Sequence, residues 1–208
     1  TLVGAGTYSY DKTKKSMSEV MPKEADWIKD YATGFKPESN SISTKENGDI
    51  TYDYLIVSPG LVMEPSMIEG LQESIDKGVV CSNYTDPEHT WEVIRNFKGG
   101  NALFTQPTTP IKCGGAPQKI AYLAADNFRK RKLDANVIFA TPGGVIFGVK
   151  EIASTLYDVI NRYGIYFRPF YAPVKIDAGK KIATFKYVKP DENQCVVNEN
   201  NSIGEKLA

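Results

Sequence analysis

The sequence is poor in the residues that build metal centres and disulfide frameworks. Its 208 residues include three widely spaced cysteines and one histidine. Such spacing fits neither the paired motifs that bind zinc nor a disulfide framework, and one histidine cannot build a histidine-rich metal site. The sequence therefore predicts no metal site.

An excess of one charge and long apolar runs are also missing. Twenty-five lysines and arginines balance 25 aspartates and glutamates, so the formal net charge is zero. A neutral chain without a basic run is not expected to have nucleic acid as its main partner. No window approaches 18 consecutive apolar residues, so no membrane-spanning helix is predicted. The chain begins at Thr1, with neither a methionine nor a secretory signal, which predicts an internal piece of a longer protein.

The first third of the chain predicts a small antiparallel meander. A short helix is expected at residues 16–20, and strands at residues 27–32, 41–44 and 50–57. The Asn47-Gly48 pair indicates a tight hairpin between the last two strands. Residues 54–57 are all apolar, which is typical of a strand buried on both faces, so they are expected to join a parallel sheet. Residues 61–80 show no strong periodicity and indicate a connector.

The remaining chain alternates strands and helices. Strands are expected at residues 101–105, 136–140 and 165–170, and helices at residues 87–97, 117–130 and 150–163. This order predicts a parallel, right-handed α/β unit. A hairpin is expected over residues 174–188, and the polar tail after Pro190 is expected to fray. The predicted fold class is α/β, with a Rossmann-like FAD/NAD(P)-binding architecture, a parallel sheet with helices and a small antiparallel β-meander.

The α/β unit lacks the features of a nicotinamide site. A dinucleotide loop needs Gly-x-Gly-x-x-Gly after the first strand, and an acidic residue after the second strand should hold the ribose. Here the first loop contains Cys113-Gly114-Gly115, and the second strand is followed by Thr141-Pro142. Nicotinamide binding by this unit is not expected. Residues 143–148 and Gly4-Ala5-Gly6 are weak candidates for phosphate loops, and for the former a closely packed turn is favoured.

Cys113 is the candidate reactive residue. Proline fits the first turn of a helix, so Pro117 indicates a helix start just after this cysteine. The free N–H groups of that start, Lys112 beside the cysteine and Lys119 about one turn into the helix favour a thiolate. A free buried cysteine remains the alternative interpretation.

The other two cysteines lack this context. Cys81 has no helix start or cation comparable to those of Cys113, so a structural role is expected. Cys195 lies in the polar tail and is interpreted as incidental.

Residues 112–123, Lys-Cys-Gly-Gly-Ala-Pro-Gln-Lys-Ile-Ala-Tyr-Leu, resemble the active-site cysteine loop of sulfide:quinone oxidoreductases of the mitochondrial eukaryotic type. Residues 1–6, 82–84 and 146–150 support the resemblance, in the order that the family shows. The resemblance covers residues 1 to about 190.

The resemblance implies a two-domain FAD-dependent flavoprotein built like glutathione reductase. Residues 1–62 would be a partial FAD-binding domain, 63–80 a connector, 81–190 a second Rossmann-like domain with the cysteine loop, and 191–208 a polar tail. Ala32 would touch the adenine through backbone atoms, and Ser58, Pro59 and Gly60 would lie near the flavin nucleotide.

The implied reaction is the oxidation of hydrogen sulfide. Hydrosulfide would attack a disulfide shared by Cys113 and a second cysteine, leaving a persulfide, and two electrons would pass through FAD to ubiquinone. Lys119 is a candidate for positive charge near the flavin or the persulfide, with a solvated helix lysine as the alternative. A sulfur acceptor such as glutathione would then take the sulfane sulfur.

The resemblance also implies a location and an incomplete site. The parent would be mitochondrial and associated with the inner membrane. The second redox cysteine, and the segments that meet quinone and membrane, would lie outside this chain. The chain alone is therefore expected neither to hold FAD tightly nor to oxidise sulfide. The alternatives are an NAD(P)H-dependent flavoprotein quinone or disulfide reductase, and a non-catalytic Rossmann-like binding module.

Overall fold

The chain folds into two compact units. The computed structural model describes residues 1–109, 111–191 and 194–197. One unit consists of Thr1–Lys12 and Val62–Ala208, and the other of Thr13–Leu61. The residues at the start of the chain therefore pack with the larger unit.

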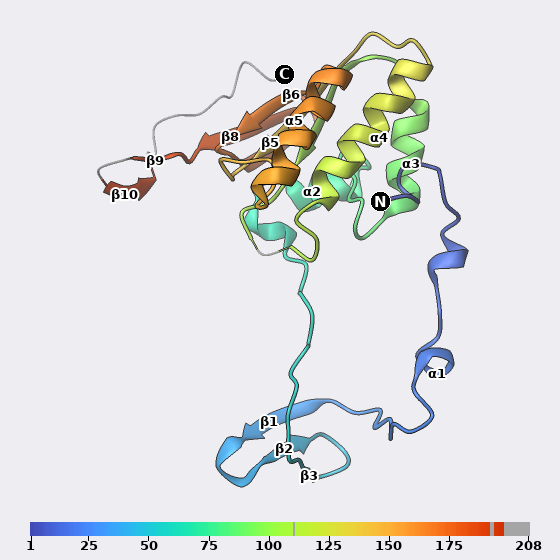
Figure 1. Ribbon diagram of the computed structural model, residues 1–208, viewed down its shortest axis with the longest axis vertical. Helices are drawn as coiled ribbons and strands as arrows, with labels where there is room; N and C mark the ends of the chain where they lie inside the picture. The colour runs from blue at the N-terminus through green and yellow to red at the C-terminus, as the bar shows by residue number, and fades with distance from the viewer. Residues whose placement is uncertain (110, 192–193, 198–208) are drawn as a thin grey trace. The chain divides into compact units, whose positions relative to one another are not determined.

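The larger unit is built on a parallel sheet of three strands in the order β4-β5-β6. The strands are β4 (Gly100–Thr105), β5 (Ala135–Thr141) and β6 (Tyr166–Pro169), and the helices that accompany them are α3 (Pro87–Asn96), α4 (Ala116–Lys130) and α5 (Lys150–Tyr163). Helix α4 packs on β4 and β5 and between α3 and α5 (Figure 1). The α/β fold class with a parallel sheet is thus confirmed.

Local signals in the sequence explain where these helices begin and end. The Asp86 side chain accepts the N–H of His89 at 2.9 Å and caps α3. Helix α5 ends at Gly164, which takes the left-handed conformation with φ +65° that glycine adopts without strain. The expected helices at residues 87–97, 117–130 and 150–163 are confirmed to within one residue at each end.

The core of the larger unit lies between α4 and the sheet. Ala121, Ala124 and Phe128 of α4 are buried against Phe139 of the central strand. Phe139 is 1% exposed, and full burial of such a ring contributes about 1.5–3 kcal/mol. Among the described residues, no helix is long and apolar enough to cross a membrane.

An antiparallel hairpin follows the parallel sheet, as expected. Strands β7 (Tyr171–Asp177) and β8 (Ile182–Tyr187) pair antiparallel, and Phe185 of β8 is fully buried. Further on, β9 (Pro190–Asp191) pairs with β10 (Gln194–Val197). The tail prediction for residues 192–193 and 198–208 lies outside the described residues.

Residues 61–80 contain two short helices that periodicity does not indicate, η3 (Pro65–Met67) and α2 (Leu71–Asp76). Helix α2 packs on β7. Gly70, the N-cap residue before α2, has a φ of +74°, and a Cβ atom on it would collide with the carbonyl of Ile176. This helix is therefore stabilised by tertiary packing, which a short sequence window does not reveal.

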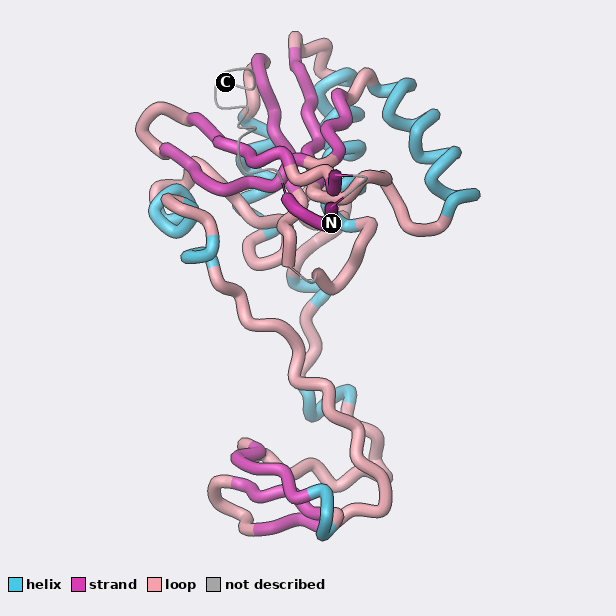
Figure 2. The backbone as a smooth tube through the Cα atoms, turned by 90° about the vertical axis from the view of Figure 1, so that its left-hand side faces the viewer, coloured by secondary structure: helices cyan, strands magenta, loops and turns pink. Residues whose placement is uncertain are grey.

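The smaller unit is the expected meander of β1 (Ala32–Lys36), β2 (Ser41–Thr44) and β3 (Asp49–Thr51), shown as magenta segments in Figure 2. It also contains η2 (Pro37–Ser39) and α1 (Met17–Val20), and the short helix η1 (Asp11–Thr13) precedes α1 in the chain. Ser16 and Glu19 cap α1 reciprocally. Gly48 takes φ +74° in the hairpin turn. The helix at residues 16–20 and the Asn47-Gly48 hairpin are confirmed.

The first predicted strand of the meander was wrong. Residues 27–31 lie outside any strand, and β1 begins at Ala32. Only the three-residue turn η2 and Asn40 separate β1 from β2, so the residues directly before that turn pair with β2, with Phe35 opposite Ile42.

The buried strand predicted at residues 54–57 was also wrong. Strand β3 ends at Thr51, which pairs with Ser41 at the beginning of β2. Tyr54 and Ile56 are 95% and 88% exposed. A strand needs a neighbour for its backbone hydrogen bonds, and no strand in the described part of the chain pairs with these residues.

Candidate active site

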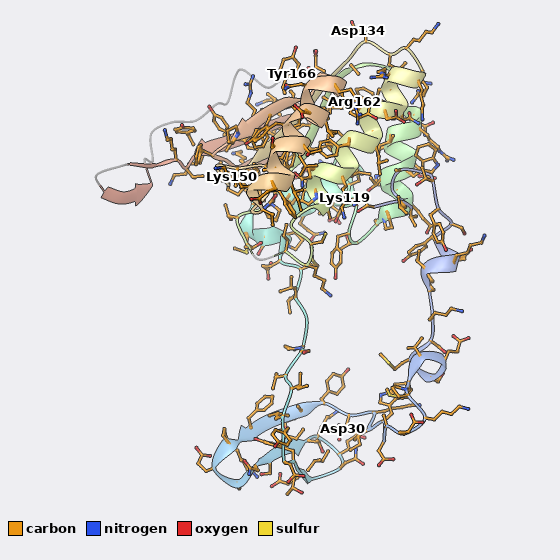
Figure 3. All side chains as sticks on the ribbon, in the orientation of Figure 1. Asp30, Lys119, Asp134, Lys150, Arg162 and Tyr166 are labelled. Carbon is orange, nitrogen blue, oxygen red and sulfur yellow. The ribbon has the colours of Figure 1, made fainter. Side chains whose placement is uncertain are left out.

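Two loops meet at the carboxyl edge of the parallel sheet. The loop after β4 carries Cys113, and the loop after β5 carries Phe147, whose ring lies 3.6 Å from the position that a Cβ atom on Gly115 would take. Lys119 and Lys150 mark the starts of α4 and α5 at this end of the unit (Figure 3). This edge is where open α/β folds bind ligands.

Cys113 is an exposed free thiol at the start of α4. The Nζ atom of Lys119 lies 3.6 Å from its Sγ atom and donates a hydrogen bond to it. The backbone N–H of Gly115, the Lys119 ammonium and the N–H of Ala116 lower the pKa of the Cys113 thiol, against a smaller opposing effect of burial. The site therefore favours the thiolate, the form that acts as nucleophile and leaving group.

Lys112 and Lys119 play different parts. The ammonium of Lys112 lies over the ring of Tyr84, 5.5 Å from its centroid. Of the two lysines that sequence places near Cys113, Lys119 is the one that hydrogen-bonds to the sulfur.

Two buried polar atoms on the first turns of α4 are features that the sequence analysis missed. The Gln118 side chain is 3% exposed, and its Oε1 atom has no hydrogen-bond partner in the described structure. The hydroxyl of Tyr122, four residues further, is likewise buried without a partner, and burial raises the pKa of Tyr122 to about 12. The sequence did contain one signal: Gln118 is the third residue of a helix that begins after a glycine pair, and a glutamine at the third helical position often interacts with the start of its own helix.

A pocket of about 420 Å³ lies beside Lys119 in the larger unit. Its lining residues are Thr1, Leu2, Lys119, Tyr122 and Leu123. The lysine therefore connects the reactive sulfur to a largely apolar cavity.

Cys81 differs from Cys113 in its surroundings. It is a half-buried free thiol, and burial raises its pKa, although a hydrogen bond with Thr90 opposes this effect. These properties agree with a structural role. The side chain of Cys195 lies outside the described residues.

The glycine runs that were weak candidates for phosphate loops instead admit neighbouring side chains. The Cα atom of Gly4 lies against the Asn83 side chain, and that of Gly6 against the ring of Trp91. A Cβ atom on Gly144 would collide with a nearby aromatic ring. The glycines serve close packing, which was the interpretation favoured for residues 143–148.

Ala32, Ser58, Pro59 and Gly60 belong to the smaller unit. Ala32 begins β1, and the other three lie outside helices and strands. All four are exposed, so their backbone groups are accessible. Cys113 and Lys119 are brought together in the larger unit, whereas these four residues are not part of it. No group of three or more histidine, cysteine, aspartate or glutamate side chains among the described residues could hold a metal ion.

Comparison with known proteins identifies relatives over nearly the whole chain. No family model matches the sequence. The chain is 38% identical over 204 residues to the mitochondrial sulfide:quinone oxidoreductase of Mus musculus, covering 96% of this chain and 45% of the relative. It is 40% identical over 201 residues to that of Dictyostelium discoideum, covering 94% and 44%.

A solved structure shows the same fold. The sulfide:quinone oxidoreductase of Aquifex aeolicus superposes with a TM-score of 0.66 at 18% identity, over 96% of this chain and 45% of that one. The chain spans about half the length of the curated relatives it matches. Identity at this level across almost all of its residues means that the chain belongs to the sulfide:quinone oxidoreductase family.

Proposed function

We propose that the chain carries the sulfide-facing redox cysteine of a mitochondrial sulfide:quinone oxidoreductase. Such an enzyme oxidises hydrogen sulfide and passes the electrons through FAD to ubiquinone. The observation that carries the proposal is the contact between the exposed Cys113 sulfur and the Lys119 ammonium at the start of α4. Cys113 and Lys119 are accordingly the proposed catalytic residues.

In the first step, hydrosulfide attacks the Sγ atom of Cys113 in a disulfide with a second cysteine. The new S–S bond forms as the old one breaks, so Cys113 becomes a persulfide and the second cysteine leaves as a thiolate. In the second step, the thiolate of an acceptor such as glutathione attacks the outer sulfur, and Cys113 leaves as a thiolate.

The surroundings of Cys113 suit this second step best. A thiol with a low pKa leaves faster in thiol–disulfide exchange. The Gly115 N–H and the Lys119 ammonium stabilise the charge that forms on the departing sulfur. Release of the sulfane sulfur from Cys113 is therefore favoured.

The residues present fit FAD by chemical type. Within the smaller unit, Ala32 and the Ser58-Pro59-Gly60 segment offer accessible backbone to the nucleotide half. When bound, FAD supplies the two-electron acceptor of the reaction. Residues 1–62 would contribute to the FAD-binding domain, 63–80 form a connector and 81–190 form the second domain.

The proposed setting is the mitochondrial inner membrane. The curated relatives are named as mitochondrial proteins. Hydrogen sulfide, ubiquinone and a thiol acceptor are the proposed partners, and membrane contact would be made by segments other than those described here.

The deciding experiment is anaerobic titration of the flavin-loaded full-length parent protein with sulfide, comparing wild type with Cys113→Ser. We expect sulfide to bleach the wild-type flavin spectrum and to bleach the variant far more slowly. Cys81→Ser is the matched control and should behave like wild type. Equal bleaching of wild type and Cys113→Ser would demote Cys113 to a structural role, and bleaching by NAD(P)H would favour a nicotinamide-linked reductase.

A further inference from the structure

The turn between β2 and β3 presents an asparagine to a spontaneous reaction. Asn47 and Gly48 are both exposed at the tip of this hairpin. In an Asn-Gly pair the backbone nitrogen of the glycine can attack the asparagine side chain, because the glycine has no side chain that hinders the approach. Gly48 is held through its carbonyl, which accepts hydrogen bonds from the N–H and the hydroxyl of Thr44 at 2.8 and 2.7 Å. Its N–H, the nucleophile of the reaction, donates no hydrogen bond to any of the described residues.

The reaction exchanges ammonia for water. The Gly48 nitrogen loses its proton to solvent and bonds to the Cγ atom of Asn47, and the Cγ–Nδ2 bond breaks as Nδ2 takes up a proton and leaves as ammonia. The cyclic imide that results then adds one water. Opening at the side-chain carbonyl leaves an aspartate, and opening at the backbone carbonyl leaves an isoaspartate, whose main chain runs through the side chain. Neither step changes an oxidation state, so water is the only reactant that the site needs.

Asp30 holds the leaving group of this reaction. Its Oδ2 atom accepts hydrogen bonds from the Nδ2 atom and the backbone N–H of Asn47 at 2.8 and 3.0 Å, and from the N–H of Glu46 at 2.9 Å. A carboxylate only accepts hydrogen bonds, so it fixes which end of the carboxamide faces it. The Asn47 carboxamide and the Glu46 N–H hold the pKa of Asp30 well below its ordinary value, so this carboxylate is ionised at neutral pH.

The Asp30 carboxylate opposes the reaction in two ways. Closing the imide turns the carboxamide and the backbone of Asn47 toward each other, which breaks their charge-assisted hydrogen bonds with Asp30. The negative charge that develops as the Gly48 nitrogen loses its proton is also disfavoured by a like charge nearby. We propose that Asn47 is a site of spontaneous deamidation whose rate Asp30 limits, and that the carboxylate formed there displaces Asp30 from the turn.

The displacement follows from the geometry of the contact. A carboxylate at position 47 would take the place of the Nδ2 atom that lies 2.8 Å from Asp30. Two carboxylates that share a site repel and do not both stay ionised without cost. An isoaspartate also lengthens the main chain between Thr44 and Gly48, whose hydrogen bonds close the turn. The inference concerns the smaller unit and does not depend on the role proposed for Cys113.

The test compares the rate of deamidation at Asn47 in the full-length parent protein and in its Asp30→Ala variant. Both are incubated at neutral pH and digested, and mass spectrometry distinguishes amide from acid in the peptide that contains Asn47. Asp30→Ala should deamidate faster than wild type on the order of ten-fold, because hydrogen bonds to a charged acceptor are lost. Asp53→Ala, which removes an exposed carboxylate from the same unit, is the matched control and should react at the wild-type rate.

A second asparagine separates loss of the contact from unfolding of the meander. Asn40, exposed at the turn between β1 and β2, is measured in the same digest. Faster reaction at Asn47 with an unchanged rate at Asn40 supports the inference. Equal rates at Asn47 in wild type and Asp30→Ala, or equal acceleration at both asparagines, would overturn it. If Asp30→Ala does not fold, Asp30→Asn, which keeps the shape and removes the charge, is judged by the same two outcomes.

The effect of the product is tested with Asn47→Asp, which places its carboxylate in the turn directly. The Thr44 amide, which donates to the Gly48 carbonyl, should exchange several-fold faster in Asn47→Asp than in Asn47→Ala. Alanine only removes the side-chain hydrogen bond to Asp30, whereas aspartate adds repulsion. Equal exchange in the two variants would show that the carboxylate does not displace Asp30 and would overturn that part of the inference.

Discussion

Replacing Lys119 by methionine should raise the pKa of Cys113 by about 0.7. The Nζ atom of Lys119 and the Sγ atom of Cys113 are 3.6 Å apart. Cys113 is exposed, so a water-like dielectric applies to the interaction between their charges. Two unit charges at about 4 Å in water interact by ~1 kcal/mol, and a pKa change of one corresponds to about 1.4 kcal/mol. At pH values well below the pKa, the thiolate fraction of Lys119→Met should therefore be roughly five-fold smaller than that of wild type.

The assay is the rate of Cys113 alkylation between pH 5 and 10, and two lysine variants serve as controls. Lys112→Met removes a charge next to the cysteine in sequence, but one that lies over Tyr84, so a smaller shift is expected. Lys130→Met removes a charge at the far end of α4, which at 1.5 Å for each of its 15 residues is ~22 Å long, and should shift nothing.

Salt gives an independent check on the same number. At 1 M ionic strength the screening length falls to about 3 Å, so the wild-type pKa should move toward that of Lys119→Met. If Lys112→Met shifts the pKa as much as Lys119→Met does, a diffuse positive potential acts on the loop and the specific contact at 3.6 Å is not the cause. No shift in Lys119→Met would leave the backbone N–H groups as the whole explanation.

Two further predictions concern the scaffold. Gly6→Ala should destabilise the larger unit by about 1–3 kcal/mol, because its Cβ would collide with the ring of Trp91 at a residue whose φ is +70°. A Cβ atom on Gly148 would have nothing within 4 Å, so Gly148→Ala should leave the melting temperature nearly unchanged. Equal melting temperatures for the two variants would contradict this prediction. Asp30→Ala should speed amide exchange of Asn47 several-fold, because Asp30 accepts hydrogen bonds from both the backbone and the side chain of Asn47. These bonds hold the pKa of Asp30 well below its ordinary range. The wild-type turn should therefore keep its protection from amide exchange above the ordinary aspartate pKa and lose that protection only as the pH falls toward the lowered pKa of Asp30. Asp30→Ala should lack this pH dependence.

Sequence predicted the elements whose ends are set by neighbouring residues. Asp86 caps α3, Gly164 ends α5, and Gly48 turns the β2–β3 hairpin, and each acts through backbone groups within a few residues. These local rules placed the helix start after Cys113, and the chemistry of a helix start then predicted a stabilised thiolate.

Sequence failed where the outcome depends on distant partners. Residues 54–57 have the composition of a buried strand, yet composition does not supply the neighbouring strand that would bury them. The orphan oxygen of Gln118 had no signal in composition either, since it becomes visible only once the packing of α4 excludes water from it.

The contrast between Lys112 and Lys119 shows why proximity in sequence is a poor guide to a site. Every Cα–Cβ bond in a helix tilts toward the helix N-terminus, so side chains on the first turn reach back over the residues before it. Lys119, six residues after Cys113, meets its sulfur for this reason, and Gln118 meets Gly115 for the same reason. Lys112 precedes the helix and is free of that constraint, so its ammonium rests on Tyr84. For a cysteine before a helix, the residues to test first are therefore the third and fourth of that helix, ahead of the immediate sequence neighbours.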